Sequence, residues 1–599
     1  MAEFSNPNQQ GGQDGQSIIT VMILVVAVVL GIHYFQTKTA PPVPASSPTP
    51  GATPQTPYTP APSAPLAPQA AAAAPTVPTV QATTEQTTIV ENDLYRITFS
   101  NRGAQATSWV LKKYKDIDGK PLDLIHHQAA SIYGFPLSLY TADASIAGAL
   151  NQAMFVPSAT GALAAPASLS FKFSTGDLVA TKTFTFDAST YVLHAEVSVT
   201  RAGAAVPALV SWPGGFSDQN ETPNQTAYTN SQFDSNINGV FNNIDAKKVV
   251  NGETQSEAFD FAGVADPFFA AIFLPDTPAT ATVTTLHNDL DVSQTIKRVG
   301  YGADKPATKP IILPVVGAAL GNTGGPTETR IFVGPKSISV LKSVHAADSK
   351  ITLEPVLEFG FWGVFGKYLF LSLQAIHTHI TAHWSGSWGW AIVVLTIFIN
   401  ILMLPFKIKT MHSALKMQRI QPQMDAIKER YKKYKITDPK RGDMNAEIMD
   451  LQKKEGVSMF GGCIPSLITF PLLIAFFTMI PRVIDLRQAN WFWLPNLQAP
   501  DPYHILPILM FVSMFAVQFY TPSPGIDPAQ QKMMMFMMPA FSLYWTWTYS
   551  SALALYWSVG NLISIVQQLV MNRTSLGREM RQIAAKRARR KAPTIQGRR

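Results

Sequence analysis

Five apolar segments lie close together between residues 387 and 571, and charge is distributed unevenly around them. Residues 406–456, which separate the first two segments, carry thirteen Lys and Arg against seven Asp and Glu, and residues 573–599 carry ten against one. The long polar stretch 40–352 is acidic, with nineteen basic and twenty-four acidic side chains. Because basic loops remain on the cytoplasmic side of a membrane, this pattern predicts a multi-pass protein of a bacterial inner membrane, with a large periplasmic domain and a cytoplasmic C-terminus.

The membrane-spanning part is expected to contain six helices. Ser17–Phe35 is an apolar run long enough to cross a bilayer, and we interpret it as an uncleaved anchor within residues 1–38 rather than as a cleaved signal peptide. Thirteen prolines fall within 41–80, so residues 39–84 are predicted to form an extended linker. The other five spans belong to a core at 387–572 and are expected at about 387–405, 463–482, 504–521, 533–549 and 552–571.

Residues 85–352 show a different pattern, with short alternating runs rich in β-branched and aromatic side chains, separated by Gly, Asn, Asp and Pro. Examples are Leu94–Phe99, Leu169–Phe173, Thr181–Phe186 and Tyr191–Val199. Such runs predict strands, and their number predicts a large β-sandwich. The expected fold class is therefore mixed: a polytopic α-helical membrane domain plus a large periplasmic β-sandwich domain. No catalytic constellation stands out in the sandwich, which favours a spacer or docking surface over a carbohydrate- or partner-binding module.

Two helical elements are expected outside the spans. Residues 353–386 are rich in aromatic side chains and predict an amphipathic helix on the membrane surface. The three histidines of this segment do not share a helical face, so no metal site is expected. The insert 406–456 has apolar side chains at helical spacing on both sides of a Thr-Asp-Pro break, which predicts a hairpin of two antiparallel helices. The basic residues 573–599 are expected to form a cytoplasmic tail.

Uncharged polar residues lie inside the spans in a regular pattern. They are Thr396 and Asn400 in the second span, Thr469 in the third, Gln518 in the fourth, and Trp557, Asn561, Ser564 and Gln568 in the sixth. Any one of them is explained by hydrogen bonds that hold helices together. The stripes on the second and sixth spans together favour a hydrated groove, through which a polar stretch of another chain would enter the bilayer without losing all its hydration.

Several long runs carry a resemblance to a known family. They are Gly461–Pro465, Asp485–Ala489, Asp501–Met510, Asp527–Met533 and Leu555–Leu562. In this order they make residues 355–573 resemble the YidC membrane protein insertases, which are related to the mitochondrial Oxa and chloroplast Alb proteins. The outer segment Thr98–Tyr114 resembles the periplasmic domain of the same family more weakly.

The resemblance implies an insertase and membrane chaperone that uses no cofactor and is not an enzyme. Its partners would be nascent membrane proteins, the ribosome, the Sec translocon and signal-recognition components. The basic insert and tail also suit anionic lipids or ribosomal RNA. Members of the family receive hydrophobic segments, alone or with the translocon, and release them sideways into lipid through a hydrophilic groove open to cytoplasm and lipid.

One groove position departs from the family pattern. Family members carry an Arg in the second span, and the matching residue here is Asn400. This change leaves hydrogen bonding without charge, unless another basic residue such as Lys407 compensates, which the sequence does not decide. Thr396 matches a client-contact position, and Trp557 lies where the family often has an aromatic client contact.

Two other classes of function compete with this interpretation. A transporter or channel with an extracytoplasmic binding domain would carry intramembrane charge and paired, broken spans. A membrane-anchored envelope enzyme would need a catalytic constellation within 85–350. Ionisable residues are nearly absent from the apolar spans, and the acidic residues of the outer stretch are scattered, so neither class is favoured.

Overall fold

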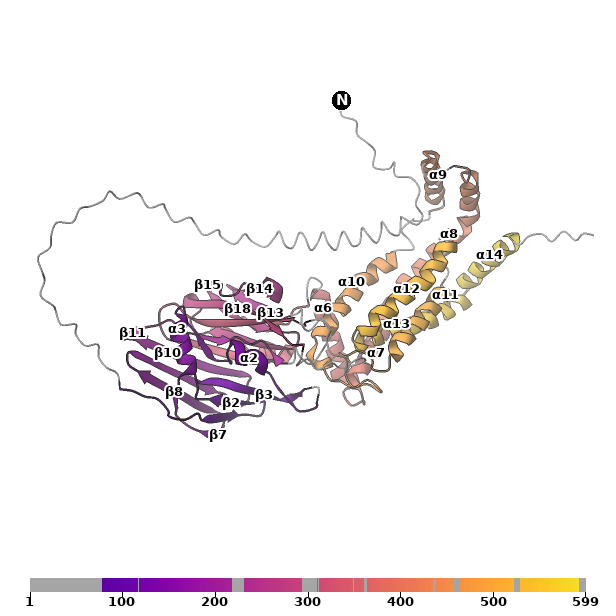
Figure 1. Ribbon diagram of the computed structural model, residues 1–599. Helices are drawn as coiled ribbons and strands as arrows, with labels where there is room; N and C mark the ends of the chain where they lie inside the picture. The colour runs from indigo at the N-terminus through magenta and orange to yellow at the C-terminus, as the bar shows by residue number, and fades with distance from the viewer. Residues whose placement is uncertain are drawn as a thin grey trace, which may run out of the picture.

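The computed structural model describes residues 78–591 except 117, 218–230, 294–309, 311, 348, 360–362, 435–437, 457–463 and 522–527. The expected N-terminal anchor and most of the expected linker lie outside the described residues. Figure 1 shows a β-rich domain and, beside it, a group of long helices formed by the C-terminal third of the chain. A β-rich domain followed by a helical region is the architecture that the sequence predicts.

The described residues of the β-rich domain form three sheets. The first has the order β4-β3-β2-β1-β7 (Pro121–Asp123, Gln105–Lys115, Tyr95–Ser100, Thr87–Glu91 and Gly161–Ala164). The second has the order β14-β13-β16-β17-β20-β10-β9-β8-β6, with β11 (Ala204–Ala205) paired to β10. Its strands are Val240–Asp245, Gln232–Ile237, Phe259–Ala265, Phe269–Pro275, Thr327–Pro335, Val192–Arg201, Leu178–Phe186, Ala167–Thr175 and Val156–Pro157. The third has the order β15-β18-β19-β12-β5 (Thr254–Ser256, Ala281–Asp291, Ile312–Asn322, Leu209–Trp212 and Ser138–Tyr140). Short helices α2 (His127–Tyr133), α3 (Ala144–Gln152) and α5 (Ile338–Ser343) connect the strands.

Aromatic side chains on the inward faces hold the sheets together. The ring of Phe99 on β2 lies 5.4 Å from that of Phe184 on β9 and thus joins the first and second sheets. Trp109 on β3 meets Trp212 on β12 edge to face at 5.7 Å and thus joins the first and third sheets. These rings are buried, and such pairs add specific geometry to the burial of apolar area.

The helical region contains α6 to α14. Their bounds are α6 Gly363–Ile376, α7 Ser387–Leu402, α8 Leu404–Arg430, α9 Lys440–Lys454, α10 Ile464–Met479, α11 Ile505–Tyr520, α12 Pro528–Thr548, α13 Ser551–Arg573 and α14 Ser575–Lys591. A π-helical turn, His377–Thr381, extends α6. Helices α7, α10, α11, α12 and α13 occupy the five positions where spans are expected.

The expected count of six spans is not confirmed. Among the described residues, one helix, Ser551–Arg573, is long and apolar enough to cross a membrane. The pair Ser387–Leu402 and Leu404–Arg430, which is bent by 47°, would make a second if it counts as one span, and Phe470–Arg482 and Ile505–Tyr520 are shorter apolar helices. The β-rich domain and the helical C-terminal region are therefore established, and the number of spans stays a prediction.

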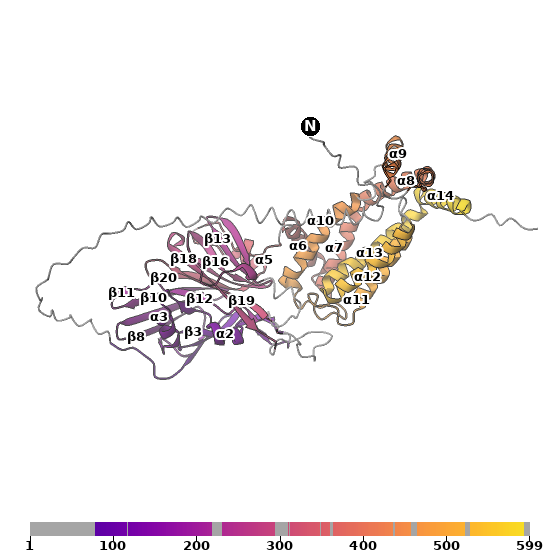
Figure 2. The same cartoon turned by 45° about the horizontal axis from the view of Figure 1, so that its top comes forward.

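The end of the helical region far from the β-rich domain is formed by α8, α9 and α14 (Figures 1 and 2). Helices α8 and α9 form a hairpin in which Ile420 and Met424 are buried. Helix α14 lies against α8 through the buried side chains of Met411, Leu415 and Met580. Arg419 on α8 also forms an ion pair with Glu579 on α14. The basic insert and the described part of the basic tail therefore form one structure.

The other end of the helical region contacts the β-rich domain. Arg487, in the loop between α10 and α11, donates a hydrogen bond to the carbonyl oxygen of Lys115 at 2.9 Å. Gln488 donates to the same oxygen at 2.7 Å, and the Arg487 guanidinium lies 5.5 Å from the centre of the Phe269 ring. A loop of the helical region and two strands of the β-rich domain thus meet through directional contacts.

Candidate functional site

The polar residues of α7 lie just before a bend in the chain. Helix α7 ends at Leu402, and α8 begins at Leu404 with Pro405 in its first turn. The Thr396 hydroxyl is buried and donates to the carbonyl of Ile392 at 2.7 Å, and Asn400 Nδ2 donates to the carbonyl of Thr396 at 2.9 Å. Both side chains therefore bond to their own helix, which leaves the Asn400 Oδ1 atom for another partner.

That partner is Lys407, at the end of the first turn of α8. Its Nζ atom donates to Asn400 Oδ1 at 3.1 Å, to Ser564 Oγ at 3.1 Å and to Gln567 Oε1 at 2.7 Å. Gln567 Nε2 donates in turn to the Asn400 carbonyl at 3.2 Å. We call these four residues, Asn400, Lys407, Ser564 and Gln567, the Lys407 cluster. It joins α7, α8 and α13, and all four side chains are half-buried.

The facing surface of α13 is close to α7 at Gly560. A Cβ atom on Gly560 would lie 3.8 Å from Thr396 Cγ2 and 3.9 Å from Asn400 Nδ2, so this glycine marks where the polar stripe of α7 meets α13. The next residue, Asn561, donates from Nδ2 to Ser513 Oγ of α11 at 3.2 Å. Polar contacts therefore run from α7 across α13 to α11.

The structure brings together only part of the predicted stripe. Ser564 and Asn400 both accept a hydrogen bond from the Lys407 ammonium. Gln568 instead donates to Asn572 of its own helix at 2.9 Å. Among the described residues, no hydrogen bond links Gln518 to the Lys407 cluster, although this side chain is half-buried on α11. Trp557 is half-buried on α13. The side chain of Thr469 lies outside the described residues.

Sequence reasoning missed Gln567 and raised Lys407 only as a question. Gln567 is three residues from Ser564, and Lys407 is seven residues from Asn400, so both spacings fit a shared helical face. The spacing between Asn400 and Lys407 was not used, because the span that contains Asn400 was expected to end before Lys407, at the membrane boundary. The helix instead continues after the bend, and Lys407 reaches back toward Asn400, in the direction in which helical side chains point.

The end of α7 nearest the β-rich domain is closed by an aromatic loop. Trp491 packs on Gly386 and Gly389, and its ring lies 5.8 Å from the Trp390 ring. His377, one of the three histidines of this segment, stacks on Trp388 with ring centroids 3.9 Å apart. Tryptophan clusters of this kind mark a membrane–water interface, which places the Lys407 cluster well inside the helical region.

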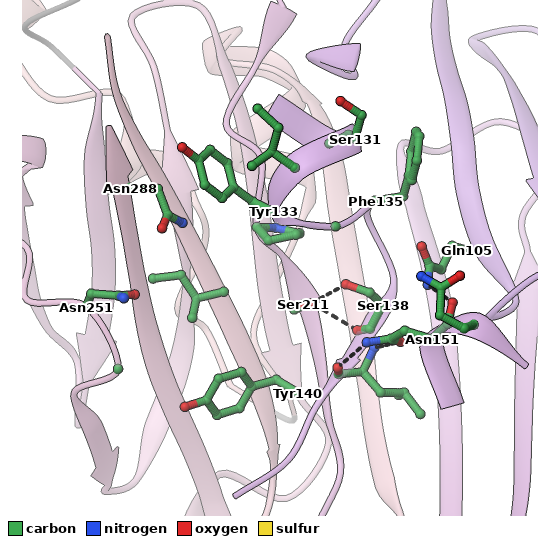
Figure 3. Close-up of a pocket in the computed structure, with 18 residues that line it drawn as sticks. Gln105, Ser131, Tyr133, Phe135, Ser138, Tyr140, Asn151, Ser211, Asn251 and Asn288 are labelled. Atoms are coloured by element: carbon green, nitrogen blue, oxygen red, sulfur yellow. Dashed lines mark hydrogen bonds between the residues drawn. The ribbon is translucent and has the colours of Figure 1, made fainter. Parts of the chain in front are cut away.

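The β-rich domain contains a hollow between α2, β5 and β18 (Figure 3). Its volume is about 540 Å³, and its walls carry Tyr133, Tyr140 and Asn288. Several of its polar groups are already paired, as in the 2.7 Å contact between the Ser138 and Ser211 hydroxyls. None of the described residues that line it is Asp, Glu, Lys, Arg or His.

Fold and site together define a helical membrane protein with a β-rich outer domain and a polar cluster between its helices. Two family models match the chain: "60Kd inner membrane protein" over residues 380–578 and "YidC periplasmic domain" over residues 87–372. The membrane protein insertase YidC of Ralstonia nicotianae is 31% identical over 84% of this chain and 86% of its own length. That of Cupriavidus necator is 30% identical over 84% and 85%.

The chain belongs to the YidC family of membrane protein insertases. It is therefore an inner-membrane insertase with a periplasmic domain, and not an enzyme. A crystal structure of an active YidC insertase matches 84% of this chain and 96% of its own chain at 15% identity, with a TM-score of 0.32. That score is too low to carry an argument about geometry.

Proposed function

We propose that clients enter the membrane along the polar surface shared by α7, α11 and α13. The observation that carries this proposal is the run of polar contacts from Asn400 through the Lys407 cluster to Asn561 and Ser513. The flanking helices are otherwise apolar, and residues 387–406, 505–520 and 533–572 contain no Asp, Glu, Lys or Arg. A client's polar flank would exchange hydrogen bonds with these groups while its apolar segment moves into lipid, and the burial of that segment supplies the free energy.

The cytoplasmic partners in this proposal bind the structure formed by α8, α9 and α14. It lies at the end of the helical region opposite the periplasmic domain, which supports a cytoplasmic position for this end and for the C-terminus. Its basic side chains suit ribosomal RNA and anionic lipids. The ribosome and signal-recognition components would deliver clients there, and the Sec translocon would share some of them. The proposed layout keeps six spans, with the N-terminal anchor as the first.

Photocrosslinking tests the client path directly. A photoreactive residue is placed at Asn400 or Trp557 during translation of a stalled, short inner-membrane protein. We expect adducts to the nascent apolar segment at both positions. Phe398 on α7 and Val566 on α13 are matched controls, because each is 60% exposed on the same helix. Adducts no stronger than those from the controls would mean that the polar residues only hold the helices together.

Substitutions in the path should affect insertion more than stability. Thr396→Val removes one hydroxyl with little change in volume, and Trp557→Ala removes a broad apolar contact surface. We expect each to slow insertion several-fold while most of the protein stays folded, since the Thr396 hydroxyl bonds to a carbonyl of its own helix and Trp557 is only half-buried. The measurement compares inserted client with folded insertase recovered in detergent. A loss of folded protein equal to the loss of insertion would contradict the groove.

A further inference from the structure

We propose that Lys407 is the residue that binds a carboxylate of the client, and that it acts at the depth of Asn400. This inference rests on the proposed function, because it gives the client path a charged group at the depth of Asn400. The first observation is the position of the ammonium, which is bound to Asn400 Oδ1 although its Cα lies two helical turns further along the chain.

The second observation is the chemistry around the ammonium. Its three partners, Asn400 Oδ1, Ser564 Oγ and Gln567 Oε1, are neutral oxygens. Among the described residues, no carboxylate forms an ion pair with Lys407. A half-buried ammonium held only by neutral groups has lost part of its hydration without gaining a counter-ion. An incoming carboxylate would therefore gain both a charge-assisted hydrogen bond and Coulomb attraction in a medium of reduced dielectric constant.

The third observation is depth, which favours a client side chain over a lipid headgroup. Trp388 belongs to the aromatic residues at the outer end of α7, and Asn400 follows twelve residues later. At about 1.5 Å per residue this distance is about 18 Å, in a hydrocarbon core of about 30 Å. The Lys407 ammonium therefore lies about 12 Å from the inner boundary of the core. Lipid phosphates lie outside that boundary, whereas an acidic side chain on an inserting segment passes this depth.

The bend between α7 and α8 makes this arrangement possible. The two helices differ in direction by 47°, and the side chain of Lys407 spans the bend to reach α7 and α13. The backbone of residue 407 can thus stay near the cytoplasmic end while its charge lies deeper. The charge enters the path from the following helix instead of from residue 400.

The test uses the full-length protein in vesicles of zwitterionic phosphatidylcholine and a single-span client made by cell-free translation. The client carries one Asp in the flank that crosses the membrane, and a matched client carries Asn there. Lys407→Gln should lower insertion of the Asp client by about ten- to a hundredfold, the range for one hydrogen bond to a charged group. Insertion of the Asn client should fall much less, so the ratio of Asp-client to Asn-client insertion drops. Lys409→Gln is the matched control, because Lys409 is exposed two residues away.

A double variant separates charge from helix packing. Asn400→Arg combined with Lys407→Gln returns a cation to the same depth from α7, and we expect it to restore the preference for the Asp client. If Lys407→Gln does not fold, this double variant and Lys407→Arg provide the measurement. A folded double variant without that preference would overturn the proposal.

Two further outcomes would also overturn it. Equal loss of both clients in folded Lys407→Gln would make Lys407 a helix-joining residue. An effect of Lys407→Gln that appears only when phosphatidylglycerol is added would assign the ammonium to lipid phosphate. Neither outcome bears on the photocrosslinks from Asn400 and Trp557, so failure of this inference is distinguishable from failure of the proposed client path.

Discussion

Replacing Gly389 with alanine is expected to displace the aromatic loop from the outer end of α7. A Cβ atom at residue 389 would lie 2.3 Å from both Cγ and Cδ1 of Trp491 and 2.7 Å from its Cβ. These atoms are close to the backbone of Trp491, so rotation of the ring cannot relieve the overlap and the loop must move. Loss of a large buried aromatic contact costs about 3–5 kcal/mol. We expect faster hydrogen exchange at Trp491 and easier proteolysis of the loop between α10 and α11.

Gly442 provides the matched control for this substitution. It also lies in a helix, α9, and a Cβ atom there would meet no atom within 4 Å. Gly442→Ala should be neutral or stabilising by up to about 1 kcal/mol, because alanine is the better helix former. Equal protection of the loop in the Gly389 and Gly442 variants would show that Trp491 packs elsewhere in the membrane.

The second large effect is expected in the periplasmic domain, at Lys182. This side chain is fully buried on β9, and its Nζ atom donates to the carbonyls of Gly103, Ala104 and Leu137 at 2.7, 3.2 and 2.8 Å. Lys182→Met keeps the length of the side chain and leaves three buried carbonyls without this donor. Each orphaned acceptor costs about 1–3 kcal/mol, partly offset because no ammonium is buried. We expect the domain to lose about 3 kcal/mol of unfolding free energy.

The same residue predicts a pH dependence. Burial lowers the pKa of Lys182 to about 7, whereas an unfolded Lys has a pKa of about 10.4. Between these two values the unfolded state binds more protons than the folded state, so this group makes stability rise as pH increases through the window and fall as pH returns toward 7. The slope of the unfolding free energy against pH approaches about 1.4 kcal/mol per pH unit. It should be absent in Lys182→Met.

Hydrogen exchange of β9 and β10 in the full-length protein, between pH 7 and 9 and corrected for intrinsic rates, measures both effects. Lys172→Met is the control, because Lys172 lies on the neighbouring strand β8 and is exposed. The control should keep both the unfolding free energy of the unchanged protein and its dependence on pH. An equal slope in Lys182→Met would assign the pH dependence to other groups.

Local patterns were sufficient to predict the class of fold. The alternation of Thr181–Phe186 predicts a strand, and the structure has β9 over Leu178–Phe186 with every second residue buried. The apolar runs likewise predict helices close to the observed bounds of α7, α10, α11, α12 and α13. Both predictions succeed because side-chain periodicity and hydropathy depend on a few neighbouring residues.

The same alternation also places Lys182 on the inward face with Phe184, although a lysine is rarely buried. The sequence gives no reason for this exception. The reason is tertiary: carbonyls from residues 103, 104 and 137 converge on one point inside the domain. Bonds between residues so far apart in the chain leave no local signal.

The candidate site also combines residues that the sequence predicts with residues that only the tertiary structure reveals. Hydropathy and helical spacing by themselves selected Thr396, Asn400 and Ser564 as polar residues on facing helices. Only the packing of α7, α8 and α13 decided that Gln567 and not Gln568 completes the cluster, because one residue turns a helical side chain by about 100°. Packing also decided that Lys407 reaches Asn400 across a bend. Periodicity determines which residues share a face, whereas the rotation and crossing of packed helices determine which faces meet.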